Sequence, residues 1–157
     1  MGEYALLIAR TGGPEWWFWL VSGVLLVWGL AYLWLTFFSF VLADSEDWNS
    51  MVEKGRILPE YVEYIAQIPN WVIGITAVAA LSRLGGAVGL LFCQRWSIWA
   101  YALSLGCVAV IMFRGFVLAD VASVIRTSQL WVEALFMAMS IFAVWFSVRV
   151  FRLGLLS

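Results

Sequence analysis

Residues 16–43 read WWFWLVSGVLLVWGLAYLWLTFFSFVLA, an unbroken run of 28 residues without a charged side chain. About 20 consecutive apolar residues are enough for a helix to cross a hydrocarbon core of about 30 Å. Because the run exceeds this length, we expect the helix to tilt or to protrude. A cleavable signal peptide has an apolar region of only about 7 to 15 residues, so we interpret the run as a retained transmembrane helix.

Three further apolar stretches follow the first one. Pro69 is well placed as the first residue of the second helix, because the N–H that proline lacks would have no partner there. Only Gln94 and Arg95 separate the second stretch from the third, so these two helices must return antiparallel as a hairpin. We predict an all-α fold in which residues 1–157 form a single integral membrane domain, a four-helix bundle with spans at about 16–43, 69–93, 96–119 and 130–151.

The composition supports a membrane protein and excludes several functions. Of the 157 residues, 64% are hydrophobic and 12% are charged, whereas soluble domains are about 45 to 50% apolar and about 25% charged. A net charge of −1 removes the electrostatic basis for binding nucleic acid. The absence of histidine excludes imidazole catalysis and imidazole-ligated cofactors. Cys93 and Cys107 fit no metal-binding spacing, and no catalytic motif is present, so we expect neither a metal site nor an enzyme.

The loop at residues 44–68 carries signals for short helices of its own. Ser50 and Glu53 have the spacing of a capping box. Pro59 and Glu60 resemble a second helix start. One or two short interfacial helices are therefore predicted in this first outer loop, and a solvated acidic loop is the alternative.

The orientation follows from the arginine and lysine residues near the ends of the spans. Cytoplasmic loops carry an excess of these residues. The excess favours both termini in the cytoplasm and the acidic loop outside. The basic residues of the cytoplasmic side are Arg10, Arg95, Arg149 and Arg152, and those of the outer side are Lys54, Arg56 and Arg126.

Arg83 is the one charged residue deep within a predicted span. At about 1.5 Å per residue it lies roughly 20 Å from the start of the second helix. A guanidinium at this depth costs about 3 to 10 kcal/mol unless it finds partners. No carboxylate of this chain maps to the same depth. Two interpretations remain open: Arg83 bonds to backbone carbonyls, hydroxyl groups or a lipid phosphate, or it binds an anion, a cofactor tail or a carboxylate of a partner protein.

Arg114 and Glu133 lie at similar depths near the outer ends of the third and fourth spans. They are predicted to form an interhelical ion pair that sets the register of the two helices. The alternative is that Arg114 extends to the membrane interface by itself.

The second span carries small residues at close spacing. Pairs of small residues four positions apart allow helix backbones to approach closely in lipid. We expect this face to pack inside the bundle, with contact between copies of the chain as the alternative. The residues are Ser82, Gly85, Gly86 and Gly89.

Several short motifs carry a resemblance to a known family. They are Leu58-Pro59-Glu60, Ile68-Pro69-Asn70-Trp71-Val72, Gly85-Gly86-Ala87-Val88-Gly89, Arg95-Trp96 and Ala102-Leu103-Ser104-Leu105. Over about residues 24–155 the chain resembles a family of small, uncharacterised four-helix proteins of the bacterial inner membrane. Some members carry the label of sugar transporter. The resemblance implies a four-helix membrane fold and a bacterial inner-membrane location.

The sequence leads to two functional hypotheses. The first is a non-catalytic accessory subunit packed against a larger bacterial inner-membrane complex of the photosynthetic or respiratory type. This hypothesis follows from three features of the sequence. No carboxylate of this chain lies at the depth of Arg83, aromatic residues lie deep within the spans, and catalytic residues are lacking. The alternative is a small four-helix transporter or channel for a small solute. The expected partners are membrane lipid and the larger complex. No cofactor is expected to be bound through side-chain ligands, which leaves only contact with lipid, a quinone or a pigment tail.

Overall fold

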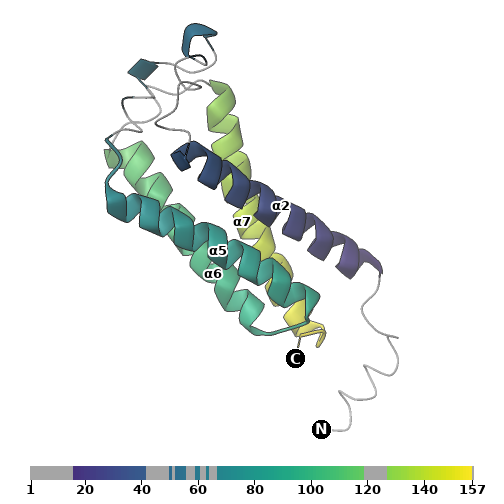
Figure 1. Cartoon of the computed structure of the whole chain (residues 1–157). Coiled ribbons are helices and arrows are strands. Elements are labelled where there is room, and N and C mark those ends of the chain that lie inside the picture. Colours follow the sequence, from purple (N-terminus) through teal and green to yellow (C-terminus); the bar gives the residue numbers. More distant parts are fainter. Residues whose placement is uncertain are drawn as a thin grey trace, which may run out of the picture.

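Four long helices make up the described part of the chain. The structure is a computed structural model that describes residues 16–41, 50, 52–55, 59–60, 63, 67–118 and 127–156. Figure 1 shows the long helices running side by side as a bundle. They are α2 (Trp16–Val41), α5 (Asn70–Leu91), α6 (Trp96–Phe113), which continues into the π-helical turn η1 (Arg114–Leu118), and α7 (Thr127–Arg152).

The prediction of an all-helical fold with four apolar spans is confirmed for the described residues. Each long helix is long and apolar enough to cross a membrane. When η1 is counted with α6, the observed ends differ from the predicted ones by at most three residues. Pro69 was expected to be the first helical residue, but its ψ of 145° is extended. Pro69 is therefore the N-cap, and α5 begins one residue later.

The hairpin between α5 and α6 depends on a residue with an unusual backbone. The N–H of Gln94 donates to the carbonyl of Gly89 at 2.8 Å, and the N–H of Cys93 donates to Leu90 at 2.9 Å. These two bonds form a Schellman motif, which ends a helix with a left-handed residue, most often glycine. Here Cys93 takes that position with φ of 53°. Its role in the turn was not foreseen from the sequence.

The end of α7 repeats this motif and folds the chain back on the bundle. Gly154, with φ of 75°, takes the left-handed position. The N–H of Leu155 then donates to the carbonyl of Val150 at 3.2 Å. The next residue, Leu156, is buried in the hydrophobic core. This end of α7 therefore lies beside the α5–α6 turn, as Figure 1 shows.

The small residues of α5 face α6. A Cβ added to Gly86 would lie 2.9 Å from the ring of Tyr101, and one added to Gly89 would lie 3.0 Å from the Cβ of Ser97. Gly85 faces the Trp96 ring at 3.5 Å. The three glycines thus allow α5 and α6 to pack closely, within the chain. Ser82, one turn before Gly86, is half-buried.

The contact between α2 and α7 is of a different kind. Close backbone packing joins α2 to α5, α5 to α6, and α6 to α7. Between α2 and α7 the contacts are made by large aromatic side chains. The ring of Phe146 lies 6.4 Å from the ring of Phe18 and 6.1 Å from that of Trp17. Because these rings span the distance between the two helices, the backbones need not approach each other.

Parts of the predictions fall outside the described residues. In the first outer loop, residues 50, 52–53, 59–60 and 63 are helical. The remaining residues of the predicted interfacial helices lie outside the described ranges. So do three basic residues used for the orientation, which are Arg10, Arg56 and Arg126.

The glycine contact leads to a first prediction. Gly86→Ala should destabilise the bundle by about 1 to 3 kcal/mol, because the buried ring of Tyr101 must move to accept the new methyl group. Gly74→Ala on the same helix is the control, since nothing lies within 4 Å of a Cβ added there. Thermal unfolding in detergent measures both variants. Equal melting temperatures for the two variants would contradict this account of the interface.

Candidate functional site

Arg83 lies at the centre of the bundle. It is 13 residues beyond the start of α5 and only 3% exposed. One side chain from each of the other three helices lies close to it: Tyr32 of α2, Tyr101 of α6 and Ser140 of α7. We refer to these four residues as the Arg83 cluster.

Two of these neighbours bind the guanidinium directly. The Nη2 atom of Arg83 donates a hydrogen bond to Oγ of Ser140. The Ser140 hydroxyl in turn donates to the carbonyl of Phe136 at 2.6 Å. On another side, the guanidinium carbon lies 4.1 Å from the centre of the Tyr32 ring, a cation–π contact. The partners in the structure are thus a hydroxyl group and an aromatic ring of the same chain.

The cluster also contains hydrogen-bond donors without acceptors. Neither Nη1 of Arg83 nor the hydroxyl of Tyr101 has a hydrogen-bond partner among the residues that the structure describes. Both atoms are fully enclosed by the surrounding atoms. The cluster is therefore a packed centre that keeps two buried donors unsatisfied within the described part of the chain.

Glu133 lies toward the start of α7, before the residues of α7 that contact the cluster. It lies on the same face of α7 as Phe136 and Ser140, three and seven residues further along the helix, and it interacts electrostatically with Tyr32. Arg114 begins the π-helical turn and is half-buried. The predicted ion pair between Arg114 and Glu133 stays a prediction.

The polar residues that could serve a transport pathway are largely engaged with the backbone. The hydroxyl of Thr76 donates to the carbonyl of Val72 at 2.8 Å. The hydroxyl of Ser104 donates to that of Ala79 at 2.9 Å. The buried hydroxyl groups of Ser22, Ser97 and Tyr101, in contrast, have no hydrogen-bond partner among the described residues.

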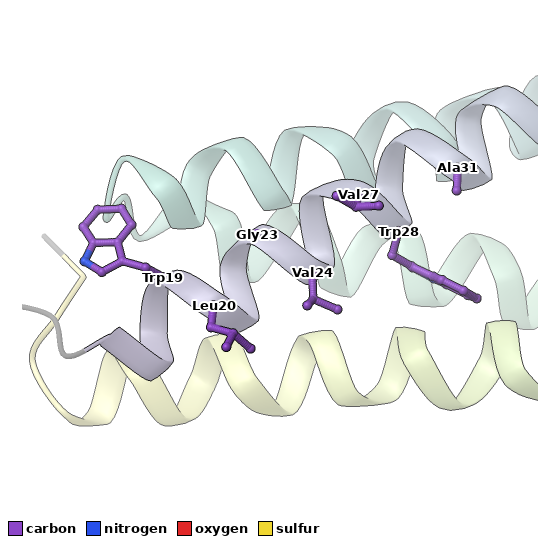
Figure 2. Close-up of a pocket in the computed structure, with 7 residues that line it drawn as sticks. All are labelled: Trp19, Leu20, Gly23, Val24, Val27, Trp28 and Ala31. Atoms are coloured by element: carbon purple, nitrogen blue, oxygen red, sulfur yellow. The ribbon is translucent and has the colours of Figure 1, made fainter.

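A groove runs along the outer face of α2, on the side toward α7 (Figure 2). Its volume is about 490 Å³, within the range of about 300 to 1,000 Å³ that is typical of small-molecule sites. Trp28 lies toward one end, and its ring packs on Phe136 of α7 at 5.1 Å. The lining residues are all apolar and all come from α2: Trp19, Leu20, Gly23, Val24, Val27, Trp28 and Ala31.

The structure brings together residues that the sequence did not connect. Ser140 was recognisable as an inward polar residue, but Tyr32 and Tyr101 were not singled out as neighbours of Arg83. The hydroxyl group of each tyrosine within an apolar span was the available signal. Within the described ranges, no group of three cysteine or carboxylate residues could hold a metal ion.

The hydrogen bond to Ser140 leads to a second prediction. Ser140→Ala should cost about 1 to 3 kcal/mol of stability, because it leaves a second buried donor of Arg83 unsatisfied. Ser147→Ala is the control, since Ser147 donates to the carbonyl of Ala143 on the same helix in the same way. Unfolding in detergent should show a larger loss for Ser140→Ala.

The difference between the two serine variants should disappear when Arg83 is replaced by leucine, because the donor is then absent. A difference that persists in the Arg83→Leu background would mean that Ser140 stabilises the bundle in another way.

No family model, curated protein or solved structure matches the chain. The function must therefore be inferred from the fold, the Arg83 cluster and the outer surface of the helices.

Proposed function

We propose that this chain is a non-catalytic accessory subunit of a larger complex in the bacterial inner membrane, of the photosynthetic or respiratory type. The four helices cross the membrane, with both termini in the cytoplasm. The subunit contacts its partners through the outer surfaces of its helices. Cofactors of the complex meet it at most through a lipid, quinone or pigment tail.

The proposal rests on three neighbouring side chains of the outer face of α7, which we call the aromatic stripe: Phe142, Trp145 and Arg149. Trp145 is 54% exposed and lies seven residues before the end of the helix, which is about 10 Å along the axis. Exposed tryptophan is enriched at membrane interfaces. A tryptophan exposed further inside the span therefore favours a contact with another protein.

The stripe has the composition of a protein-binding surface. The ring of Phe142 lies 5.8 Å from that of Trp145, and the guanidinium of Arg149 lies 5.7 Å from the Trp145 ring on the other side. Tryptophan and arginine are enriched among the residues that contribute most to binding energy at interfaces. Trp145, held between its two neighbours, is the proposed anchor.

The Arg83 cluster supports a structural role within this subunit. The side chain of Arg83 is enclosed by α2, α6 and α7, so a carboxylate of a partner has no access to it from outside the bundle. Contact with the complex therefore involves the outer surface, and Arg83 holds the helices that present this surface.

The charge distribution supports the proposed orientation. Arg149 and Arg152 lie in the last turn of α7, which packs near the start of α2, and Arg95 donates a hydrogen bond to the carbonyl of Leu156 at the same end. At the opposite end the described residues include Lys54 together with acidic residues such as Glu53. The excess of arginine at the first end favours the cytoplasmic side for both termini.

The aromatic stripe leads to a third prediction. Extraction in mild detergent should recover the chain with a much heavier complex, and Trp145→Leu should reduce this recovery by about tenfold or more. Trp99→Leu is the control, because Trp99 is equally large and 78% exposed on α6. Mass spectrometry of the copurifying proteins measures the association. A single species at the mass of the chain alone would contradict the proposal.

A small-solute transporter is the second candidate. The donors of Arg83 and Tyr101 that lack acceptors favour it, since a solute with acceptor groups would satisfy them. Liposomes that contain only this chain should then take up a labelled sugar or small anion, and Arg83→Gln should abolish the uptake. If the chain is an accessory subunit, these liposomes show no uptake above that of protein-free liposomes.

A further inference from the structure

The groove on α2 is a surface that no other part of the described chain covers. Leu20, Val24 and Val27 are all exposed along it, Val27 by 67%. All the residues that line it belong to α2, so it is an open groove along one helix.

The length of the groove matches the hydrocarbon chain of one lipid leaflet. Ala31 lies 12 residues after Trp19, which is about 18 Å along the helix. Half of a hydrocarbon core of about 30 Å is about 15 Å. The groove begins near the first turn of α2, where Trp16 and Trp19 are suited to the membrane interface, and it ends toward the middle of the span.

The charged residues near the first end of the groove are basic. Arg149 and Arg152 lie in the last turn of α7, and the last turns of α7 pack against the first turns of α2 through Phe146 and Phe18. Arg95 lies at the same end, where it contacts the Phe151 ring and the carbonyl of Leu156. No acidic residue lies at this end within the described ranges. A head group that binds here would be anionic.

We propose that the groove on α2 binds one acyl chain of an anionic glycerophospholipid, whose phosphate lies at the basic end of the bundle near Arg152. This proposal goes beyond the accessory role and shares with it only the condition that the chain spans a membrane. The acyl chain follows α2 from Trp19 to Trp28, and the head group stays at the interface.

Gly23 allows a direct test of the acyl-chain site. Nothing lies within 4 Å of a Cβ added to Gly23, so Gly23→Leu fills the groove without a clash inside the protein. Gly106→Leu is the matched control, because Gly106 lies within the span of α6 and has the same open surroundings. Val27→Phe fills the groove from a second position.

The measurement is the thermal stabilisation of the delipidated chain in detergent by added phosphatidylglycerol. The wild type and Gly106→Leu should be stabilised alike. Gly23→Leu and Val27→Phe should weaken the apparent affinity by about tenfold or more. Equal responses of all four proteins would overturn the proposal, and so would a loss of the response in Gly106→Leu.

The head group is tested by comparison with phosphatidylcholine. The wild type should bind phosphatidylglycerol more tightly, and Arg152→Gln should reduce this preference by about fivefold, the effect of one basic residue near an anionic surface. Arg152→Lys should restore it, and Lys54→Gln at the opposite end should leave it unchanged. Equal affinity for both lipids would overturn the assignment of the head group.

A further experiment distinguishes binding of lipid in the groove from binding of a second copy of the chain. Cross-linking in detergent should show the same oligomeric state for the wild type and Gly23→Leu. If the wild type is a dimer and Gly23→Leu is a monomer, the groove binds another copy and the lipid proposal fails. Because this experiment uses the isolated chain, its result does not depend on whether a larger complex copurifies.

Discussion

A guanidinium enclosed in an apolar helix bundle needs partners within the protein, and this constraint favours the observed arrangement of the helices. Arg83 lies on α5, its hydrogen-bond acceptor Ser140 on α7, and its aromatic partner Tyr32 on α2. Three helices are thus connected at mid-depth by a single side chain. Because an unsatisfied charge is expensive in this environment, the interaction strongly favours arrangements in which all three helices meet. In lipid, where no hydrophobic force drives helices together, such polar contacts contribute to the association of helices.

The remaining contacts divide the bundle into two different halves. On one side, α5 and α6 pack closely because Gly86 and Gly89 leave space for Tyr101 and Ser97. On the other side, α2 and α7 are joined by the rings of Phe18 and Phe146. Small residues bring backbones together, whereas large aromatic residues hold them apart.

The interior and the outer surface of the bundle therefore have different roles. The interior is packed, and two hydrogen bonds within it, from Arg83 to Ser140 and from Ser104 to Ala79, join neighbouring helices. The outer surface carries the features that suit other molecules, namely the groove on α2 and the stripe around Trp145 on α7. An accessory subunit needs a rigid interior and an outer surface with specific contacts. The two proposals concern different parts of this surface and are independent of each other.

By itself, the sequence determined that the chain forms four apolar helices, that α5 and α6 form a hairpin, and that the glycines of α5 form a packing surface. These features are local, because the length of an apolar run and the spacing of small residues depend only on neighbouring positions. Only the tertiary structure decided which side chains meet Arg83, since Tyr32 and Ser140 are distant from it in sequence and many hydroxyl groups lie at similar depths. The left-handed turn at Cys93 was also unpredictable, because glycine usually occupies that position. The groove on α2 could not be predicted either, because which face of α2 stays uncovered depends on how the other helices pack against it.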